Sequence, residues 1–221
     1  RFLTGPQVST ETIVLDGIAH TPAISDRNYE YLARWAPHVI ENGGDMPSRL
    51  EPEARQAVCA LVQAAAAALG IDDWVAKGDI AFEAGAPLVI EIAGRLSGGY
   101  FCTHQTPLST GVELVDAVIS LSLGERVDPG SLTPRHHRPA CQRYVFPAPG
   151  RITAIAGVDE ARALPGVHEI VVGRGVGDEV PVPRDSNASA AMIMTTGATR
   201  EEAQRVAAVA ARLLRIETEP T

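Results

Sequence analysis

DIAFEAGAPLVIEIAGRLSGG, from Asp79 to Gly99, is the most informative stretch of the 221-residue sequence. It predicts two strands joined by a tight turn at Gly85-Ala86-Pro87. Leu88-Val89-Ile90 is a short apolar run that favours a buried strand. A loop with adjacent glycines, Ser97–Gly99, follows, and we call it the glycine loop. The stretch therefore predicts a β-hairpin that leads into a loop.

One acidic residue lies on each predicted strand of this hairpin. Asp79 and Glu91 are 12 residues apart, so the turn can bring their carboxylates side by side. Neighbouring carboxylates repel each other unless a cation lies between them, and Mg²⁺ prefers oxygen ligands. The pair therefore predicts a Mg²⁺ site, and a hairpin with an ordinary salt bridge is the alternative.

Two features after the second strand suit an anion. Arg95 follows Glu91 by four residues, and its guanidinium fork matches phosphate or carboxylate oxygens. The glycine loop can offer backbone N–H groups without side chains in the way. Together with the two acids, these features predict a metal–phosphate site.

The run VIEIAGRLSGG, from Val89 to Gly99, resembles the metal-binding strand of the ATP-grasp superfamily, with its Glu-x-Asn-x-Arg core. The resemblance implies that Asp79 and Glu91 bind Mg²⁺, with Mn²⁺ as an alternative metal. It also implies ATP as co-substrate and Arg95 as the catalytic group that faces the transferred phosphate. Ala93 stands where Asn often helps to hold a second Mg²⁺, so the number of metals stays open.

The longer run GRLSGGYFCTHQTPLSTGVELVDAVISLSLG, from Gly94 to Gly124, resembles the amino-acid-ligase branch of this superfamily. That resemblance implies that Ser97, Gly98 and Gly99 contact the acyl substrate and that Cys102 and His104 lie near it. A thiol nucleophile made of Cys102 and His104 is an alternative that an ATP-driven ligase does not need.

A helix is expected in the second part of this run, from about Val112 to Leu123. Val112, Val115, Ile119 and Leu123 repeat at helical spacing, so we expect them to face the core.

The first residues, RFLTGPQVSTETIVLDG, predict a strand from Val8 to Leu15 that ends in a hairpin turn at Asp16-Gly17. The stretch resembles the ATP-grasp segment that runs from the adenine hinge into the second half of the nucleotide clamp. By that resemblance Leu3 and Glu11 bind the nucleotide, Leu3 at the adenine edge and Glu11 beneath the phosphates. The alternative is an ordinary hairpin with Glu11 on a wet face.

Residues 28–50 have an irregular pattern. Similar loops in ATP-grasp ligases carry a Glu and a His near the substrate, followed by Pro-Ser. Glu41 fits that pattern as a substrate-binding residue, whereas Gly44 stands in the place of the His. Glu51–Leu69 predicts a helix closed by Gly70, and its alanine-rich face could serve a homodimer.

The remaining chain divides into a linker and a small domain. Residues 125–139 are rich in Pro, Gly and Arg, and the later strands and two helices predict a ferredoxin-like α+β unit. Thr199 opens the last helix with a capping box to Glu202. The buried stripe expected on that helix consists of Ala203, Val206, Val209 with Ala210, and Leu213.

The predicted fold class is therefore α+β. An ATP-grasp catalytic subdomain, an antiparallel sheet with helices, is expected over residues 1–124, and it is followed by the linker over 125–139. The unit over 140–221 resembles the C-terminal domain of amino-acid ligases, which implies a lid. Residue 1 is not Met and lies in a strand-like stretch, which suggests a part of a longer product.

The composition limits the classes of binding partner and the cellular compartment that we expect. A formal net charge of −8 and the lack of a basic stripe argue against nucleic acid as a partner. The three cysteines are scattered and suit a reducing compartment. No signal peptide or membrane span is recognisable, since the apolar run Ala57–Leu69 is too short to cross a bilayer. We therefore expect a cytoplasmic protein.

The resemblance implies an ATP-dependent carboxylate–amine ligase that joins amino acids or short peptides through an acyl phosphate, releasing ADP and phosphate. The lysines that reach the phosphates lie in the upstream half of such enzymes, so this chain is expected to need that half as a partner. The alternatives are another ATP-grasp ligase, of the carboxylase or purine-pathway type, and a non-catalytic scaffold derived from the same fold.

Overall fold

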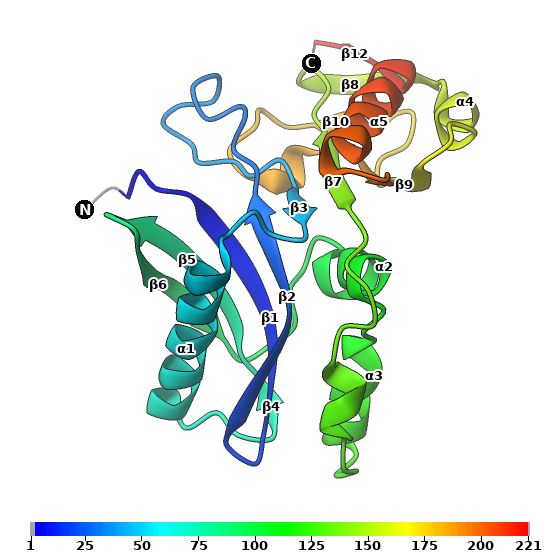
Figure 1. Cartoon of the computed structure of the whole chain (residues 1–221). Helices are drawn as coiled ribbons and strands as arrows, with labels where there is room; N and C mark the ends of the chain where they lie inside the picture. The colour runs from blue at the N-terminus through cyan, green and yellow to red at the C-terminus, as the bar shows by residue number, and fades with distance from the viewer. Residues whose placement is uncertain (1–2, 221) are drawn as a thin grey trace. The chain divides into compact units, whose positions relative to one another are not determined.

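A computed structural model describes residues 3–220 of the chain (Figure 1). These residues form two compact units. Residues 3–27 and 46–138 make up the N-terminal unit, and residues 28–45 and 139–220 make up the C-terminal unit. The segment 28–45 therefore folds with residues that lie about a hundred positions further along the chain.

The N-terminal unit is built on an antiparallel sheet. Its strands β6 (Ala86–Ala93), β5 (Lys77–Glu83), β1 (Gln7–Leu15) and β2 (Ile18–Arg27) lie in this order. A two-residue strand, β4 (Trp74–Val75), also pairs with β1. The hairpins predicted at both ends of this unit are confirmed, because β1 pairs with β2 and β5 pairs with β6.

Helix α1 (Pro52–Leu69) covers one face of this sheet (Figure 1). Val58 and Val62 of the helix are fully buried and pack against apolar residues of the strands, among them Val8 and Ile80. The helix ends at Gly70, which has a φ of 69° and so adopts the left-handed conformation that glycine accommodates best. The predicted helix and its C-terminal glycine are confirmed.

The prediction that Leu88–Ile90 forms a buried strand is wrong. These residues do lie on a strand, β6, but their exposed fractions are 40%, 39% and 51%. β6 is the outermost strand of the unit's sheet. An apolar run reveals strand propensity, but it does not reveal how many strands or helices will cover it.

Short helices follow β6. A π-helical turn, η1 (Phe101–Gln105), leads into α2 (Thr106–Thr110) and α3 (Leu114–Ser122), and a 3₁₀ turn, η2 (Pro129–Leu132), comes next. The expectation that Ile119 and Leu123 are buried is wrong, since they are 53% and 70% exposed. The helix begins two residues later than predicted. Val112, just before it, is buried as predicted, and within the helix Leu114 and Ala117 face the core.

The segment expected to be a linker is held on the N-terminal unit. Leu132 is buried against Ile13 and Leu15 of β1. The N–H of Arg138 donates to the carbonyl of Ser109 at 2.8 Å, and residue 138 still belongs to this unit.

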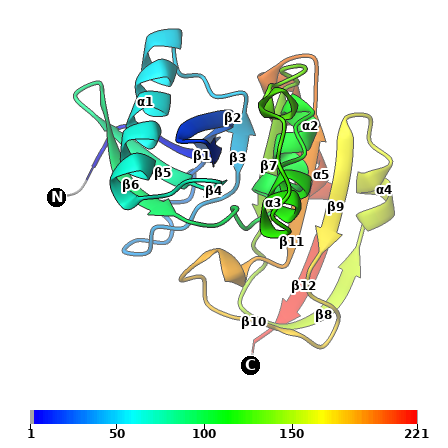
Figure 2. The same ribbon diagram turned by 90° about the horizontal axis from the view of Figure 1, so that it is seen from below.

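The C-terminal unit contains two groups of strands (Figure 2). One has the order β3 (Gly44–Met46), β7 (Ala140–Val145), β11 (Ala191–Thr196), β9 (Val167–Val172). The other has the order β10 (Glu179–Val180), β8 (Gly150–Ala156), β12 (Arg215–Glu219). The helices α4 (Val158–Arg162) and α5 (Arg200–Leu213) and a 3₁₀ turn, η3 (Ser186–Ala188), complete it. The α+β class is confirmed, with the strands in two sheets rather than in one ferredoxin-like sheet.

Helix α5 begins as predicted. Thr199 Oγ1 accepts a hydrogen bond from the N–H of Glu202 at 3.1 Å. Its buried stripe, however, consists of Ala203, Ala207 and Ala210, whereas the predicted valines and Leu213 are only partly buried. Alanines at the centre of the stripe allow the helix backbone to approach the strands closely, and the larger side chains then lie at the edges.

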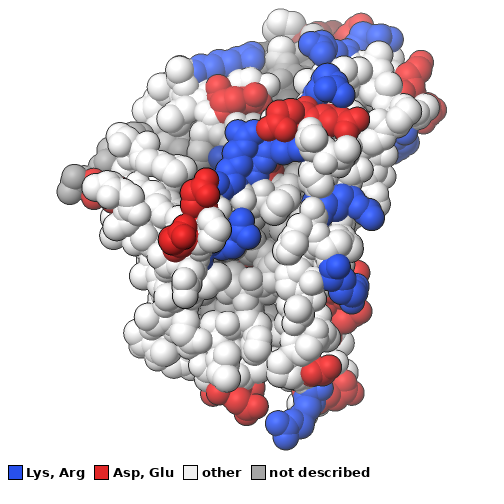
Figure 3. Space-filling view, viewed as in Figure 1, with Lys and Arg blue, Asp and Glu red and all other residues white. Residues whose placement is uncertain are grey.

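Acidic and basic side chains both lie on the surface of the protein. On the face drawn in Figure 3, lysine and arginine are interspersed with aspartate and glutamate. Within residues 3–220, no helix combines the length and the apolar character needed to cross a membrane.

Candidate active site on the polar face of the N-terminal sheet

Charged and polar residues gather on the sheet face opposite α1. Ser9 pairs with Asp79 across β1 and β5, and Asp79 pairs with Glu91 across β5 and β6. Directly opposed residues of antiparallel strands point to the same face, as do residues two apart on one strand. Glu11 and Lys77 therefore share this face, which we call the polar face.

Asp79 is surrounded by donors. It is only 8% exposed, and its Oδ1 accepts a hydrogen bond from Ser9 Oγ at 2.8 Å. Arg27 Nη1 lies 3.0 Å from Oδ1, and the Lys77 ammonium pairs with Oδ2. Burial raises the pKa of Asp79, but Arg27, Lys77 and Ser9 together outweigh it and hold the pKa below its ordinary value of 3.8. The carboxylate is therefore ionised and has a positive group at each oxygen.

Glu91 lies opposite Asp79 but in a different environment. Its side chain is exposed. A β-bulge follows the pair, because Ile80 pairs with Val89 and leaves Ile90 as the extra residue of β6. Bulges of this kind commonly redirect side chains beside functional sites. The predicted side-by-side placement of Asp79 and Glu91 is confirmed, and their role as metal ligands stays a prediction.

The two carboxylates fit one Mg²⁺ ion. Mg²⁺ is commonly held by one or two carboxylates, with waters and substrate phosphates completing its octahedron. The cations now paired with Asp79 indicate that this buried carboxylate requires a positive partner. Ala93 lies opposite Lys77 and offers no ligand. Among residues 3–220, no three His, Cys, Asp or Glu side chains come together as a metal site made of protein alone.

Glu11 is held under the glycine loop. It lies on β1 and is completely buried. Its Oε1 accepts a hydrogen bond from the backbone N–H of Ser97 at 2.9 Å. Burial raises the pKa of Glu11 to about 7, although Ser97, Lys77 and Arg95 each favour the ionised form. Within residues 3–220 its hydrogen bond is made to the loop, and its predicted nucleotide-binding role stays a prediction.

The glycine loop itself is open to solvent beyond Ser97. Gly98 and Gly99 are exposed, and a Cβ built on Gly98 would meet no atom within 4 Å. Arg95 is exposed and its Nη1 donates to the carbonyl of Leu96 at 3.1 Å. The structure therefore leaves room above this loop for a ligand.

Cys102 and His104 do not form a thiolate–imidazolium pair. Burial, followed by the nearby Glu11, raises the pKa of the Cys102 thiol to about 11. The thiol donates to the carbonyl of Ser97 at 2.9 Å, and His104 Nδ1 lies 2.7 Å from Thr103 Oγ1. This geometry argues against the alternative of a thiol nucleophile.

Two other predicted site residues lie away from secondary structure. Leu3 precedes β1 and is partly exposed. Glu41 lies in the 28–45 segment of the C-terminal unit and is partly buried. Their assignments to nucleotide and substrate binding stay predictions.

The sequence interpretation missed Arg27 as a site residue. It lies at the end of β2, two residues after Ser25, which pairs with Ser9. Counting alternate residues along the strand that follows the predicted hairpin turn at Asp16-Gly17 would have placed position 27 on the polar face. Its guanidinium reaches across β1 to Asp79, which only strand pairing could reveal.

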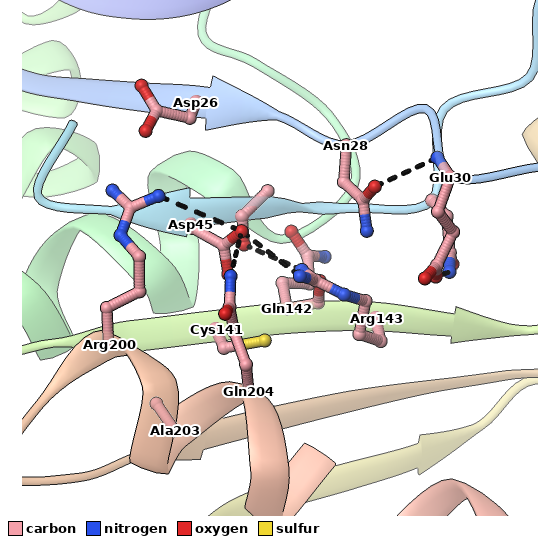
Figure 4. Close-up of polar contacts among 12 residues, drawn as sticks. Asp26, Asn28, Glu30, Asp45, Cys141, Gln142, Arg143, Arg200, Ala203 and Gln204 are labelled. Carbon is pink, nitrogen blue, oxygen red and sulfur yellow. Dashed lines mark hydrogen bonds and ion pairs between the residues drawn. The ribbon is translucent and has the colours of Figure 1, made fainter. Parts of the chain in front are cut away.

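A second buried carboxylate, Asp45, lies in the C-terminal unit (Figure 4). Arg143 Nη2 and Gln204 Nε2 each lie 3.0 Å from its Oδ2, and Arg200 Nη1 lies 3.9 Å away. These donors come from β7 and α5, so Asp45 connects the 28–45 segment to both elements.

Comparison with known proteins places the fold. Residues 143–219 match the family model described as L-amino acid ligase C-terminal domain 2. The crystal structure of an L-amino acid ligase from Bacillus licheniformis matches 99% of this chain, with a TM-score of 0.85 and 23% sequence identity. The chain has the fold of ATP-grasp enzymes, and residues 143–219 are similar to a C-terminal domain of L-amino acid ligases. The resemblance seen in the sequence is thereby confirmed.

Other structures with this ATP-grasp fold are similar. Phosphoribosylglycinamide synthetase from Anaerococcus prevotii matches with a TM-score of 0.84 and 15% identity, over 99% of this chain and 55% of that one. N5-carboxyaminoimidazole ribonucleotide synthetase from Thermotoga maritima matches with a TM-score of 0.71 and 15% identity. The match covers 99% of this chain and 54% of that one. This chain also spans 55% of the L-amino acid ligase, so it covers about half the length of each of the three structures. A search of curated proteins found no match.

Proposed function

We propose that this ATP-grasp region supplies the metal-binding and acyl-binding half of an ATP-dependent carboxylate–amine ligase. The observation that carries the proposal is the polar face, where Asp79 and Glu91 lie opposite each other beside Arg27 and Lys77. The similarity of residues 143–219 to an L-amino acid ligase domain favours amino acids or short peptides as substrates.

The reaction that fits this face has two steps. A substrate carboxylate oxygen attacks the γ-phosphorus of ATP, and ADP leaves with the electrons of the broken P–O bond. An amine then attacks the acyl carbon, loses a proton and releases phosphate, which leaves an amide. When bound, Mg²⁺ offsets negative charge on the phosphates, and Asp79 and Glu91 are the residues that would hold it.

Arg95 would supply positive charge to the phosphates in addition to the metal ion. Its exposed guanidinium is bonded only to a neighbouring carbonyl among the contacts described, so it can turn toward an anion at little cost. A guanidinium there would stabilise charge on the transferring phosphoryl group. Ser97–Gly99 would hold the acyl group through backbone N–H groups.

We also propose that a preceding half completes the nucleotide site. The chain covers 55% of the L-amino acid ligase structure that it resembles. Lys77, the one lysine placed on the polar face, is engaged with Asp79. The isolated 221 residues are therefore expected to bind ATP weakly and to turn over slowly.

A purine-pathway ligase is the second candidate, because phosphoribosylglycinamide synthetase has a similar fold over the same length. The two candidates differ in the acid that becomes the acyl phosphate. The family model over residues 143–219 favours the amino-acid branch.

The test is ADP release with Mg²⁺ and ATP against the twenty amino acids, singly and in pairs, by the full-length gene product and by this chain. We expect pair-dependent ADP from the full-length protein, and a loss of roughly a hundredfold or more for Glu91→Gln. Glu53→Gln, at an exposed acid on α1, is the matched control and should behave as wild type. Full activity of Glu91→Gln, or robust turnover by the isolated chain, would refute the proposal.

A further inference from the structure

Within the glycine loop, Ser97 is held on both sides of its backbone, by Glu11 of β1 and by Cys102 of η1. Glu11 accepts from the Ser97 N–H and Cys102 donates to the Ser97 carbonyl, each at 2.9 Å. The three residues are buried, with exposed fractions of 0%, 9% and 5% for Glu11, Ser97 and Cys102. Gly98 and Gly99, immediately after, are exposed. Ser97 is therefore the point at which the loop is anchored.

We propose that Glu11 is a positioning residue: its buried carboxyl anchors Ser97 and so sets where the glycine loop presents its N–H groups to an acyl substrate. The substrate in this statement rests on the proposed function above. The anchor itself rests on contacts within the chain.

The chemistry of the contact favours an anchor over a direct ligand. Glu11 is completely buried, so no substrate atom can touch it while the loop is closed. Its Oε2 and the Ser97 Oγ have no hydrogen-bond partner among the described residues. Buried oxygens without a hydrogen-bond partner lower the stability of the closed loop.

The same burial makes the anchor sensitive to pH. The titratable groups that face Glu11 are Lys77 on β5, Arg95 before the loop and Cys102 on η1, and β2 contributes the neutral Ala23 opposite it. The two cations favour the ionised form, yet burial raises the pKa of Glu11 from 4.5 to about 7. Glu11 therefore changes its protonation state near neutral pH while the loop stays closed.

The sign of the effect follows from where the proton binds more tightly. In the closed loop the pKa of Glu11 is about 7, whereas in an open, solvated loop it returns toward 4.5. Protonation of Glu11 therefore stabilises the closed loop, and this stabilisation is complete below about pH 4.5. It is lost as the pH rises to about 7. The fraction of open loop should therefore rise by up to about a hundredfold between about pH 5 and 7 and change little at higher pH.

The experiment compares Glu11→Gln with the wild type in the full-length protein, from pH 5 to 8. Glutamine keeps an oxygen that accepts the Ser97 N–H, but it cannot ionise. The readouts are hydrogen exchange of the peptide that contains Ser97 and site-resolved alkylation of Cys102 by a small thiol reagent. Mass spectrometry separates Cys102 from Cys59 and Cys141.

The informative quantity is the ratio of the wild-type rate to the Glu11→Gln rate, because the intrinsic pH dependence of thiol and amide chemistry cancels. We expect this ratio to rise by up to about a hundredfold between about pH 5 and 7 and then to level off. A ratio that stays constant with pH overturns the pH sensitivity, and unchanged exchange at Ser97 in Glu11→Ala overturns the anchor. Thr12→Val is the matched control, since Thr12 is buried on the same strand but bonds to Thr21, and it should keep the wild-type profile.

Kinetics then test the substrate-positioning part. In an active full-length protein, Glu11→Ala should raise KM for the carboxylate substrate about tenfold and leave KM for ATP within about twofold. Faster exchange at Ser97 with unchanged KM would overturn the substrate-positioning part and keep the anchor. A protein without ligase activity refutes the proposed function, and the exchange ratio still tests the anchor.

Discussion

Two buried aspartates, one in each unit, show how alike a binding group and a structural group can look. Asp79 and Asp45 are 8% and 5% exposed, and each is paired with two cationic side chains. Opposite Asp79 lies a second, exposed carboxylate, Glu91. Asp45, in contrast, is faced by donors from β7 and α5.

An acid in an ion pair therefore does not by itself mark a ligand site. Asp79 belongs to a pair of carboxylates, and under the proposed function a metal would replace its lysine and arginine as the positive partner. The positive groups around Asp45 already outnumber it, and their loss would leave buried charges without a partner. Asp45 is therefore expected to matter for stability and Asp79 for stability and binding.

The largest expected effect is that of Asp45→Ala. The change leaves Arg143 and Arg200, whose side chains are 15% and 10% exposed, without their carboxylate. We expect the free energy of unfolding to fall by about 3–5 kcal/mol, measured by urea denaturation. Asp159→Ala is the control, since that side chain is 95% exposed and should cost less than about 1 kcal/mol. Equal losses in the two variants would remove the structural role assigned to Asp45.

Asp79→Asn should have a smaller effect that depends on pH. Near pH 7 we expect a loss of roughly 2–3 kcal/mol, because an amide pairs more weakly with Lys77 and Arg27. The folded-state pKa of Asp79 lies below 3.8, so its contribution is present above about that pH and is lost as pH falls through the lowered pKa.

Urea denaturation of wild type and Asp79→Asn at a series of pH values checks this expectation. The two unfolding free energies should converge in acid. A difference that stays constant down to about pH 2 would mean that Asp79 is not held in its ionised form by its neighbours.

Lys77→Met should change metal affinity by a modest factor. In the structure the ammonium pairs with Asp79, so a metal must displace it. Removing it should strengthen Mn²⁺ or Mg²⁺ binding about three- to tenfold in the absence of nucleotide, by isothermal titration. Arg126→Met, at a side chain that is 93% exposed, is the control. Weaker metal binding in Lys77→Met would argue that Asp79 is not a ligand.

The smallest expected change in stability is that of Glu91→Gln. Its side chain is exposed, so the free energy of unfolding should change by no more than about 0.5 kcal/mol by urea denaturation. The same substitution is expected to abolish most ADP formation. A large loss of stability here would make Glu91 resemble Asp45 and would weaken the contrast between the two units.

Much of the fold could be predicted from local patterns. The Asp79–Glu91 pairing followed from two strand-like runs and a turn of suitable length, and α1 followed from Pro52 and Gly70. The capping hydrogen bond at Thr199 followed from the glutamate three residues later. These features depend on residues close together in sequence, where backbone geometry leaves few choices.

Long-range packing explains the features that the sequence patterns did not predict. Residues 28–45 fold with the C-terminal unit because Asn42 and Asp45 bond to Tyr144 and Arg143, about a hundred residues away. At Gly43, with a φ of 73°, a Cβ would lie 2.2 Å from the carbonyl oxygen of Gln142. Neither the close approach nor the partner is visible in a local pattern.

Local sequence patterns were enough to predict the longer helices, most strands and the chemical types available to the polar face, because periodicity and turn chemistry act within a few residues. Which charges meet depends on the tertiary structure. Pairing of β1 with β2 and β5 brings Arg27 and Ser9 to Asp79, and packing of the loop over β1 buries Glu11. Strand register and burial are properties of the whole fold, and they set the charge and the pKa of each group.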